Sequence, residues 1–371
     1  MKHSIVLGHL PALLTVLLLS SGAPAAHASP ATAWQVELQL KSVHHADALS
    51  LGALDDEDQA LRQLAPRRGR NLAYVDDEAR LSLRRDAWRL SVLARSRGHA
   101  ITNHDTLDLA TTVARRGKPS EHRHWYTTLD YSSFQGAGGE LAYRWASSNG
   151  WFGEVGVQAL QLRHWRERQL DGNVSYDAGS QAYAFDLRSL HADDRLRFPF
   201  QQAFDQRGMG VLFSSEIGWS SGAWGVRAGF RDLGRLQWDG LPQQQAWLST
   251  QTEDYDADGL VIYRPLLTGR NSQGRRSERS RGQGWLHLSY QWTGVGEFGV
   301  GSEWIPRFGP LPVLGWRGAL GPADASVQWR HHEQRLDFSV AWRGWQLQWG
   351  ANTLGSGRRS QSMGLRKQFD L

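Results

Sequence analysis

The chain contains no cysteine, which excludes disulfide bonds and thiolate metal sites. Proline is scarce, with 12 residues in 371. The mean hydropathy is −0.51, and after the amino-terminal segment no apolar run is long enough for a membrane-spanning helix. These absences exclude a polytopic helical membrane protein. The net charge of +5 is too small to indicate nucleic-acid binding by itself.

Apolar and aromatic residues are nevertheless plentiful. Hydrophobic residues make up 40% of the chain, which is too many for a disordered protein, and there are 18 tryptophans and 40 glycines. The length exceeds that of a usual single domain, but a large all-β barrel can form one domain of this size. Because no linker or fixed-period repeat interrupts residues 29–371, we predict a single domain there.

Residues 1–28 have the pattern of an export signal. Lys2 supplies the positive charge, Ile5 to Leu19 is mostly apolar, and Ala26-His27-Ala28 matches an A-x-A cleavage site. A membrane anchor is the alternative, but the apolar run is shorter than the ~20 residues that span a bilayer. We therefore expect cleavage after Ala28 and export of residues 29–371.

The exported part alternates between apolar and polar residues with period two, which is typical of β-strands with one apolar face. The clearest examples are residues 33–41, 79–84, 88–92, 286–292, 337–343 and 345–349. Turn-like residues occur at 85–86, 147–150, 220–222, 293–296 and 343–344. Longer polar connections are expected at 44–73, 166–180, 191–208 and 266–284.

Short turns at one end and long loops at the other are typical of transmembrane barrels. At ~20 residues for each strand with its connection, the fold class predicted is an all-β, antiparallel, up-and-down transmembrane barrel of about 16 strands, within a range of roughly 14–18. A spanning sheet must close, because lipid cannot satisfy an open edge.

A soluble β-sandwich or solenoid also alternates with period two. The polar faces here, however, carry many Arg, Gln and Glu residues, as a lumen does. Tryptophans also lie near segment ends, where membrane interfaces favour amphipathic rings. These tryptophans are Trp125, Trp145, Trp151, Trp219, Trp224, Trp304 and Trp345.

The carboxyl-terminal segment, Ser362 to Leu371, reads SMGLRKQFDL. It resembles the closing strand of Gram-negative outer-membrane β-barrel proteins, whose last residue is usually aromatic and is read by the barrel-assembly machinery. Here the last residue is Leu371 and the aromatic residue is Phe369. The resemblance implies an outer-membrane location, contact with the lipid bilayer and lipopolysaccharide, and assembly by that machinery. It indicates no nucleic-acid partner and no particular oligomeric state.

Two groups of arginines are candidate binding residues. Alternation directs Arg80, Arg84, Arg89 and Arg95 inward, where charged rings can set pore selectivity or structural ion pairs can close the lumen. The second group lies in the expected polar loop at 266–284, where guanidinium groups can bind lipopolysaccharide phosphates, steer anions or be solvated only. Its members are Arg270, Arg275, Arg276, Arg279 and Arg281.

A possible weak Ca²⁺ site is the only cofactor expected. Asp254, Asp256 and Asp258, followed by Gly259, match the start of a D-x-D-x-D-G loop, but Pro265 replaces the twelfth-position Glu. The alternative is a solvated acidic turn. The adjacent pairs His44-His45 and His331-His332 point to opposite strand faces, so we expect no histidine metal site.

The leading functional hypothesis is a passive channel or transporter for small polar or anionic solutes. The alternative is a structural or assembly barrel of a surface or secretion apparatus. The third hypothesis is a lipid- or peptide-hydrolysing barrel. We expect no enzyme.

Overall fold

The computed structural model describes residues 34–55, 57–199, 201–204, 207–255, 258, 261–263, 265–355 and 357–371. The expected export signal at 1–28 lies outside the described residues. The elements are β1 (Gln35–Ala46), the 3-10 helix η1 (Leu51–Asp55), α1 (Glu57–Arg62), β2 (Arg70–Arg85), β3 (Trp88–Asn103), α2 (His104–Ala114), β4 (Arg123–Ala146), β5 (Trp151–Asp177), β6 (Ala182–Asp193), β7 (Gly208–Ser221), β8 (Trp224–Ser249), β9 (Glu253–Tyr255), β10 (Val261–Tyr263), β11 (Leu267–Trp292), β12 (Gly296–Ile305), β13 (Gly309–Leu320), β14 (Ala323–Arg330), β15 (Arg335–Trp342), β16 (Trp345–Ala351) and β17 (Ser360–Asp370).

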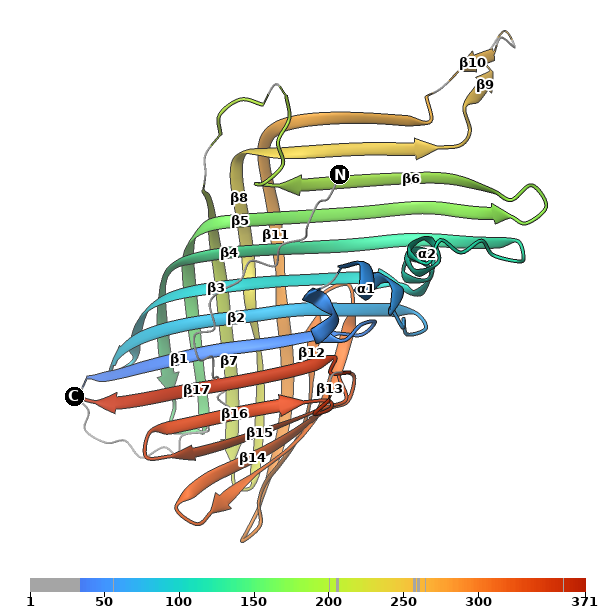
Figure 1. Ribbon diagram of the computed structural model, residues 1–371. Coiled ribbons are helices and arrows are strands. Elements are labelled where there is room, and N and C mark those ends of the chain that lie inside the picture. The colour runs from blue at the N-terminus through green and yellow to red at the C-terminus, as the bar shows by residue number, and fades with distance from the viewer. Residues whose placement is uncertain are drawn as a thin grey trace.

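The sheet closes on itself. It contains 15 strands, and antiparallel pairing of its first and last strands along the chain, β1 and β17, together with the pairing of β8 with β11, closes the ring (Figure 1). β6 and β7 share one place in the order, because each pairs with β5 on one side and β8 on the other. The barrel therefore has 14 strand positions, the lower end of the predicted range. This confirms the predicted all-β antiparallel barrel.

The apolar strand faces point outward. Trp34, Val340 and Trp349 are 40%, 44% and 39% exposed. On the opposite face, the side chains of Arg80 and Arg95 are only 10% and 3% exposed. An exposed apolar belt around a charged interior is the inverse of a soluble core, and lipid is the solvent that suits it.

Sharp turns connect the strands at the end of the barrel where β1 begins and β17 ends. The turn Arg343-Gly344 separates the paired residues Trp342 and Trp345, and both central residues have positive φ, 47° and 75°. This is the two-residue geometry that matches strand twist, and Gly344 tolerates it without a Cβ clash. The predicted turn is therefore confirmed.

A row of exposed tryptophans marks the same end. Its members are 40–59% exposed and lie at or just before the strand ends, as expected for an interfacial girdle. They are Trp34, Trp88, Trp151, Trp224, Trp292, Trp342 and Trp345. Trp125 was predicted to lie at the interface, but it does not belong to this girdle. It is 2% exposed, packs with Val174 and Tyr176, and donates a hydrogen bond to Asp108.

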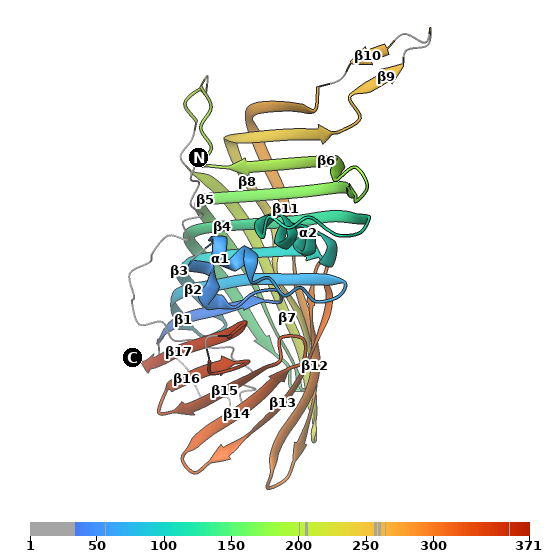
Figure 2. The same cartoon turned by 45° about the vertical axis from the view of Figure 1, so that its right-hand side comes forward.

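The opposite end is uneven. β4, β5, β8 and β11 have 24–27 residues, whereas β14, β15 and β16 have 7 or 8 (Figure 2). The polar loops predicted at 166–180 and 266–284 are wrong, because these residues extend β5 and β11. Their Gly, Ser and Arg side chains suit a solvated two-sided ribbon as well as a loop. Connections do fall within 44–73 and 191–208.

Two α-helices, which the sequence analysis did not predict, lie at the uneven end. The Asn103 side chain caps α2 by accepting a hydrogen bond from the Thr106 amide, 3.0 Å away. Arg115, just after α2, donates to the carbonyl of Arg62 at the end of α1. Among the described residues, no helix is long and apolar enough to cross a membrane.

Candidate functional site: the barrel interior

The predicted inward arginines do line the interior, and each has a carboxylate partner. Arg89 contacts Glu154 at 2.7 Å and Glu140 at 2.8 Å. Arg80 pairs with Glu78 at 2.8 Å and also with Glu140. Strands β2 to β5 place these residues on their inward faces, so acids and bases are interspersed on this part of the wall. The sequence left two hypotheses for these arginines: a charged ring that sets pore selectivity, or ion pairs that close the lumen. The ion pairs observed in this layer agree better with the second.

The central contact joins β3 to β8, although β4, β5 and β7 separate these strands in the sheet. Arg95 donates to both oxygens of Asp232, at 2.6 and 3.2 Å, and to the side-chain oxygen of Gln158 at 3.0 Å. Arg97 also donates to Asp232. The Arg95 and Asp232 side chains are 3% and 4% exposed, so this bidentate pair crosses the interior without water between the charges.

Backbone geometry brings Asp232 to this position. Its φ of +63° lies in the left-handed region, which Asp tolerates better than most residues. The change in strand direction turns Asp232 inward immediately after Arg231, which also lies within 3.3 Å of Asp76. Sequence alternation alone placed neither of these two residues.

Further contacts close the interior toward the uneven end. Leu72 and Ile101 from β2 and β3 form a buried cluster with Ile305 and Leu311 from β12 and β13. These strand pairs are far apart in the sheet order, so the cluster reaches across the barrel. The turn between β12 and β13 therefore folds over the interior.

A second apolar cluster lies inside the wall and was not predicted. Leu93 is two residues from Arg95 on β3 and therefore shares its inward face. Across the interior, Trp165 and Trp238 are 0% and 1% exposed. The complete cluster is Leu93, Phe134, Leu160, Leu162, Trp165, Ala192, Leu212, Leu236, Trp238 and Leu241.

This cluster coincides with an interruption in the wall. β5 pairs with β7 up to Leu162 and with β6 from Arg166 onward. β8 pairs with β7 up to Gln237 and with β6 from Gln243. Between these levels the ladder from β6 and β7 is absent, because the chain leaves the sheet between Asp193 and Gly208. At this level Asp194 satisfies the backbone of Trp165, and buried apolar side chains pack where the ladder stops.

The second arginine group is not one site. Arg276 points inward and contacts Glu167 at 2.6 Å, whereas Arg275 is exposed and pairs with Asp239 at 2.5 Å. Arg270, Arg279 and Arg281 are exposed. The strand conformation of β11 explains the separation, because successive side chains point to opposite faces.

A buried polar cluster at the end of β1 was missed entirely. Asp47, 0% exposed, accepts hydrogen bonds from Nε2 of His45 at 3.1 Å and Nε2 of His332 at 3.0 Å. Its oxygens also lie 3.0 Å from Arg67 and 2.8 Å from the Leu72 amide. The alternation of strand faces correctly predicted that the two histidines of each adjacent pair point to opposite faces. Closure of the barrel nevertheless brings His45 of one pair close to His332 of the other.

The His45, Asp47 and His332 donor set is of the type that binds zinc, with three ligand atoms within 4.8 Å of one another. The Asp47 carboxylate is nevertheless satisfied by four donors. Nδ1 of His45 is buried without a partner, so it lacks the acceptor that normally orients a metal-bound histidine. These contacts support a structural role, in which the cluster fastens β1 to the turn after β14.

Asp47→Asn is expected to lower the free energy of unfolding by about 3 kcal/mol. Burial alone raises the pKa of Asp47, but hydrogen bonds from His332 and His45 outweigh it and hold that pKa well below its usual range. A depressed pKa means that the stabilisation is present above about pH 4 and lost as the pH falls further. Urea unfolding in micelles between pH 3 and 7 measures it. A wild-type-to-variant difference that grows below pH 4 would contradict this account.

The predicted calcium site is not tested. Asp254 lies in β9 and Asp258 in the turn that follows, but Asp256 lies outside the described residues. The weak Ca²⁺ site stays a prediction.

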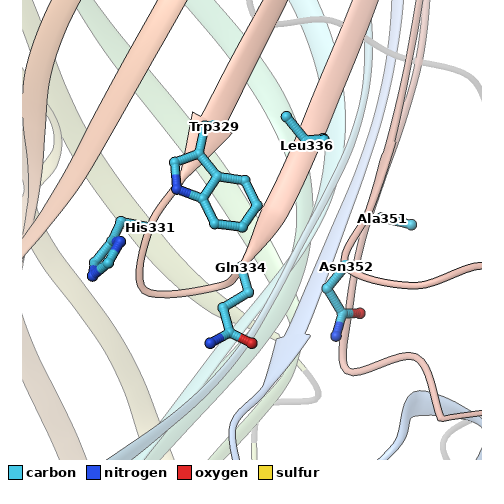
Figure 3. A pocket seen from close by; sticks show the side chains of 6 residues that line it. All are labelled: Trp329, His331, Gln334, Leu336, Ala351 and Asn352. Atoms are coloured by element: carbon cyan, nitrogen blue, oxygen red, sulfur yellow. The ribbon is translucent and has the colours of Figure 1, made fainter.

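A pocket of about 350 Å³ lies where β14 turns into β15 (Figure 3). Trp329 pairs with Leu336, which is 40% exposed and points away from the interior. The pocket therefore opens on the lipid-facing side of the wall and is separate from the interior contacts. Its lining residues are Trp329, His331, Gln334, Leu336, Ala351 and Asn352.

The closed strand order, apolar exterior, charged interior and tryptophan girdle define one architecture. It is that of an outer-membrane β-barrel. No protein-family model matches the chain, and no curated protein does.

Solved structures similar to the chain include hydrocarbon channels. A mutant of the monoaromatic hydrocarbon channel TodX is 9% identical with a TM-score of 0.43, covering 91% of this chain and 90% of that one. The Pseudomonas putida toluene transporter TodX has a TM-score of 0.40 at 9% identity, covering 91% and 89%. The Ralstonia pickettii toluene transporter TbuX has a TM-score of 0.30 at 9% identity, covering 91% and 88%. Similarity this low carries no argument about a solute.

Proposed function

We propose that the protein is an outer-membrane channel for small apolar solutes, closed in the state described here. The observation that carries the proposal is the inward apolar cluster at the place where β6 gives way to β7. Much of the interior is charged, and these ten apolar residues form a larger apolar cluster than the one formed by Leu72, Ile101, Ile305 and Leu311 toward the uneven end.

The cluster suits an apolar solute energetically. Burying apolar surface contributes roughly 25 cal/mol per Å². An apolar molecule therefore gains binding free energy in contact with Trp165 or Leu236, and it gains none beside arginine and glutamate. The interruption also removes backbone hydrogen bonds that a moving strand would otherwise have to break. Side-chain movement is therefore sufficient to open the wall at this level.

The substrate class expected from the sequence, small polar or anionic solutes, is not supported. Arg84 lies 3.7 Å from Glu154, and Arg80, Arg89 and Arg95 have still closer carboxylate partners. A paired layer presents no net positive ring to an anion. These same contacts favour the second candidate, a closed structural or assembly barrel.

Uptake measurements separate the two candidates. In Gram-negative cells that produce the barrel, we expect faster entry of the apolar dye N-phenylnaphthylamine than in cells without it. In liposome swelling with a small sugar, we expect no permeability. Equal dye entry with and without the barrel would favour the structural barrel, and sugar permeability would restore the polar channel.

A further inference from the structure

An exposed cationic patch lies on the outer wall, away from the interior. Arg235 on β8 and Arg279 on β11 are directly opposite in the strand register, and both are exposed. Directly opposed side chains share one face of the sheet and lie about 5 Å apart at Cβ. Arg281 on β11 and Arg163 on β5 are also exposed.

These four arginines face outward. On β11 Glu278, immediately before Arg279, receives a hydrogen bond from Ser132 on β4, which places Glu278 inside. Residues at odd positions beside it, including Arg279 and Arg281, therefore point away from the interior. On β8 the buried Leu236 points inward, so the adjacent Arg235 points outward.

No carboxylate in the part of the chain that the structure describes neutralises this patch. Among the described residues, none of Arg163, Arg235, Arg279 and Arg281 has an acidic side chain within ion-pair distance. Arg235 is held by its Nε, which donates to Ser277 Oγ at 2.5 Å. Two like charges directly opposite each other destabilise a strand pair, unless an anion lies between them.

The distance of the patch from the tryptophan girdle shows which layer of the membrane surrounds it. Arg281 lies eleven residues from the girdle residue Trp292 on β11, and Arg235 lies eleven residues from Trp224 on β8. At ~3.4 Å per residue and a tilt of about 40°, this separation is roughly 28 Å along the membrane normal. The apolar band of such barrels is about 25 Å tall, so the arginines lie at the level of the opposite headgroups.

The end with short turns, where β1 begins and β17 ends, faces the periplasm in this architecture, so the arginines lie in the outer leaflet. The patch is confined to one sector, because β1 and β2 carry Ser42 and Asp77 outward toward that end. We propose that Arg235 and Arg279, assisted by Arg281 and Arg163, bind the phosphorylated glucosamine headgroup of one lipopolysaccharide molecule. Their forked guanidinium groups replace the divalent cations that otherwise bridge such phosphates.

The test uses the folded barrel in zwitterionic nanodiscs with purified lipid A, lipid A lacking its phosphates, or phosphatidylglycerol as the added lipid. We expect lipid A to be retained in the presence of EDTA, and Arg235→Gln/Arg279→Gln to weaken its binding about tenfold or more. The matched control, Arg144→Gln/Arg343→Gln, removes one arginine near the periplasmic end of β4 and one in a periplasmic turn, and it should leave binding unchanged.

Three results would overturn the proposal. These are equal lipid A affinity in wild type and the patch variant, equal affinity for dephosphorylated lipid A, and the same variant-dependent affinity for phosphatidylglycerol. If the glutamine variant does not fold, Arg235→Lys/Arg279→Lys keeps the charge and removes the forked geometry. A several-fold loss of lipid A affinity in that variant supports the proposal, and unchanged affinity contradicts it.

Discussion

Asp232→Asn is expected to make the closed barrel conduct ions. The substitution leaves the guanidinium groups of Arg95 and Arg97 without the carboxylate that both contact. Removing one partner of a buried pair typically costs about 3–5 kcal/mol, and the two freed cations repel each other. Water must enter to solvate them. In planar bilayers we expect a nearly silent wild type and stepwise conductance from the variant.

Asp239→Asn is the control for this experiment. Asp239 pairs with Arg275, but their side chains are 47% and 67% exposed, so solvent screens the pair and it contributes little to stability. The control should stay silent in the bilayer. If Asp232→Asn folds, as judged by its tryptophan emission, and is equally silent, the central ion pair does not close the interior.

The double variant Trp165→Ala/Trp238→Ala is expected to admit the apolar dye about tenfold faster, a change that corresponds to about 1.4 kcal/mol in the barrier. Both indoles are fully or almost fully buried where the ladder from β6 and β7 is absent. Their removal leaves apolar space at that level while the Arg95–Asp232 contact remains. Dye entry should therefore rise without ion conductance.

The matched control removes two exposed tryptophans instead. Trp292 and Trp304 are 59% and 57% exposed on the outer wall, so Trp292→Ala/Trp304→Ala should leave dye entry unchanged. Each buried substitution costs about 3–5 kcal/mol, so folding is checked first by heat-modified gel mobility. A folded Trp165/Trp238 variant with wild-type dye entry would exclude this part of the wall as the route.

Period-two alternation was sufficient to predict the barrel, because lipid outside and charge inside impose opposite demands on adjacent residues. The girdle residues Trp151, Trp224 and Trp345 were predicted from their place near segment ends. Trp125 was not distinguished from them, because only the structure shows α2 and its Asp108 beside that ring. Composition also misled at 266–284, where glycine, serine and arginine extend β11.

The interior contacts were less predictable, because they join residues far apart in sequence. Alternation identified Arg95 as inward but not its partner Asp232, which is 137 residues away and depends on a positive φ. The separation between Asp47 and His332 is 285 residues, and barrel closure alone brings them together. The interruption between β6 and β7 leaves no period in the sequence, since it is defined by pairing with β5 and β8.

The most direct test of the account is which strand face contacts lipid. The chain has no cysteine, so single Cys substitutions can each carry one spin label. Labels at Leu288 and Val340 should collide with membrane-dissolved oxygen, whereas labels at the adjacent Ser289 and Ser339 should not. Oxygen contact at the two serine positions, with none at Leu288 and Val340, would contradict the orientation on which the interior and the proposed channel both depend.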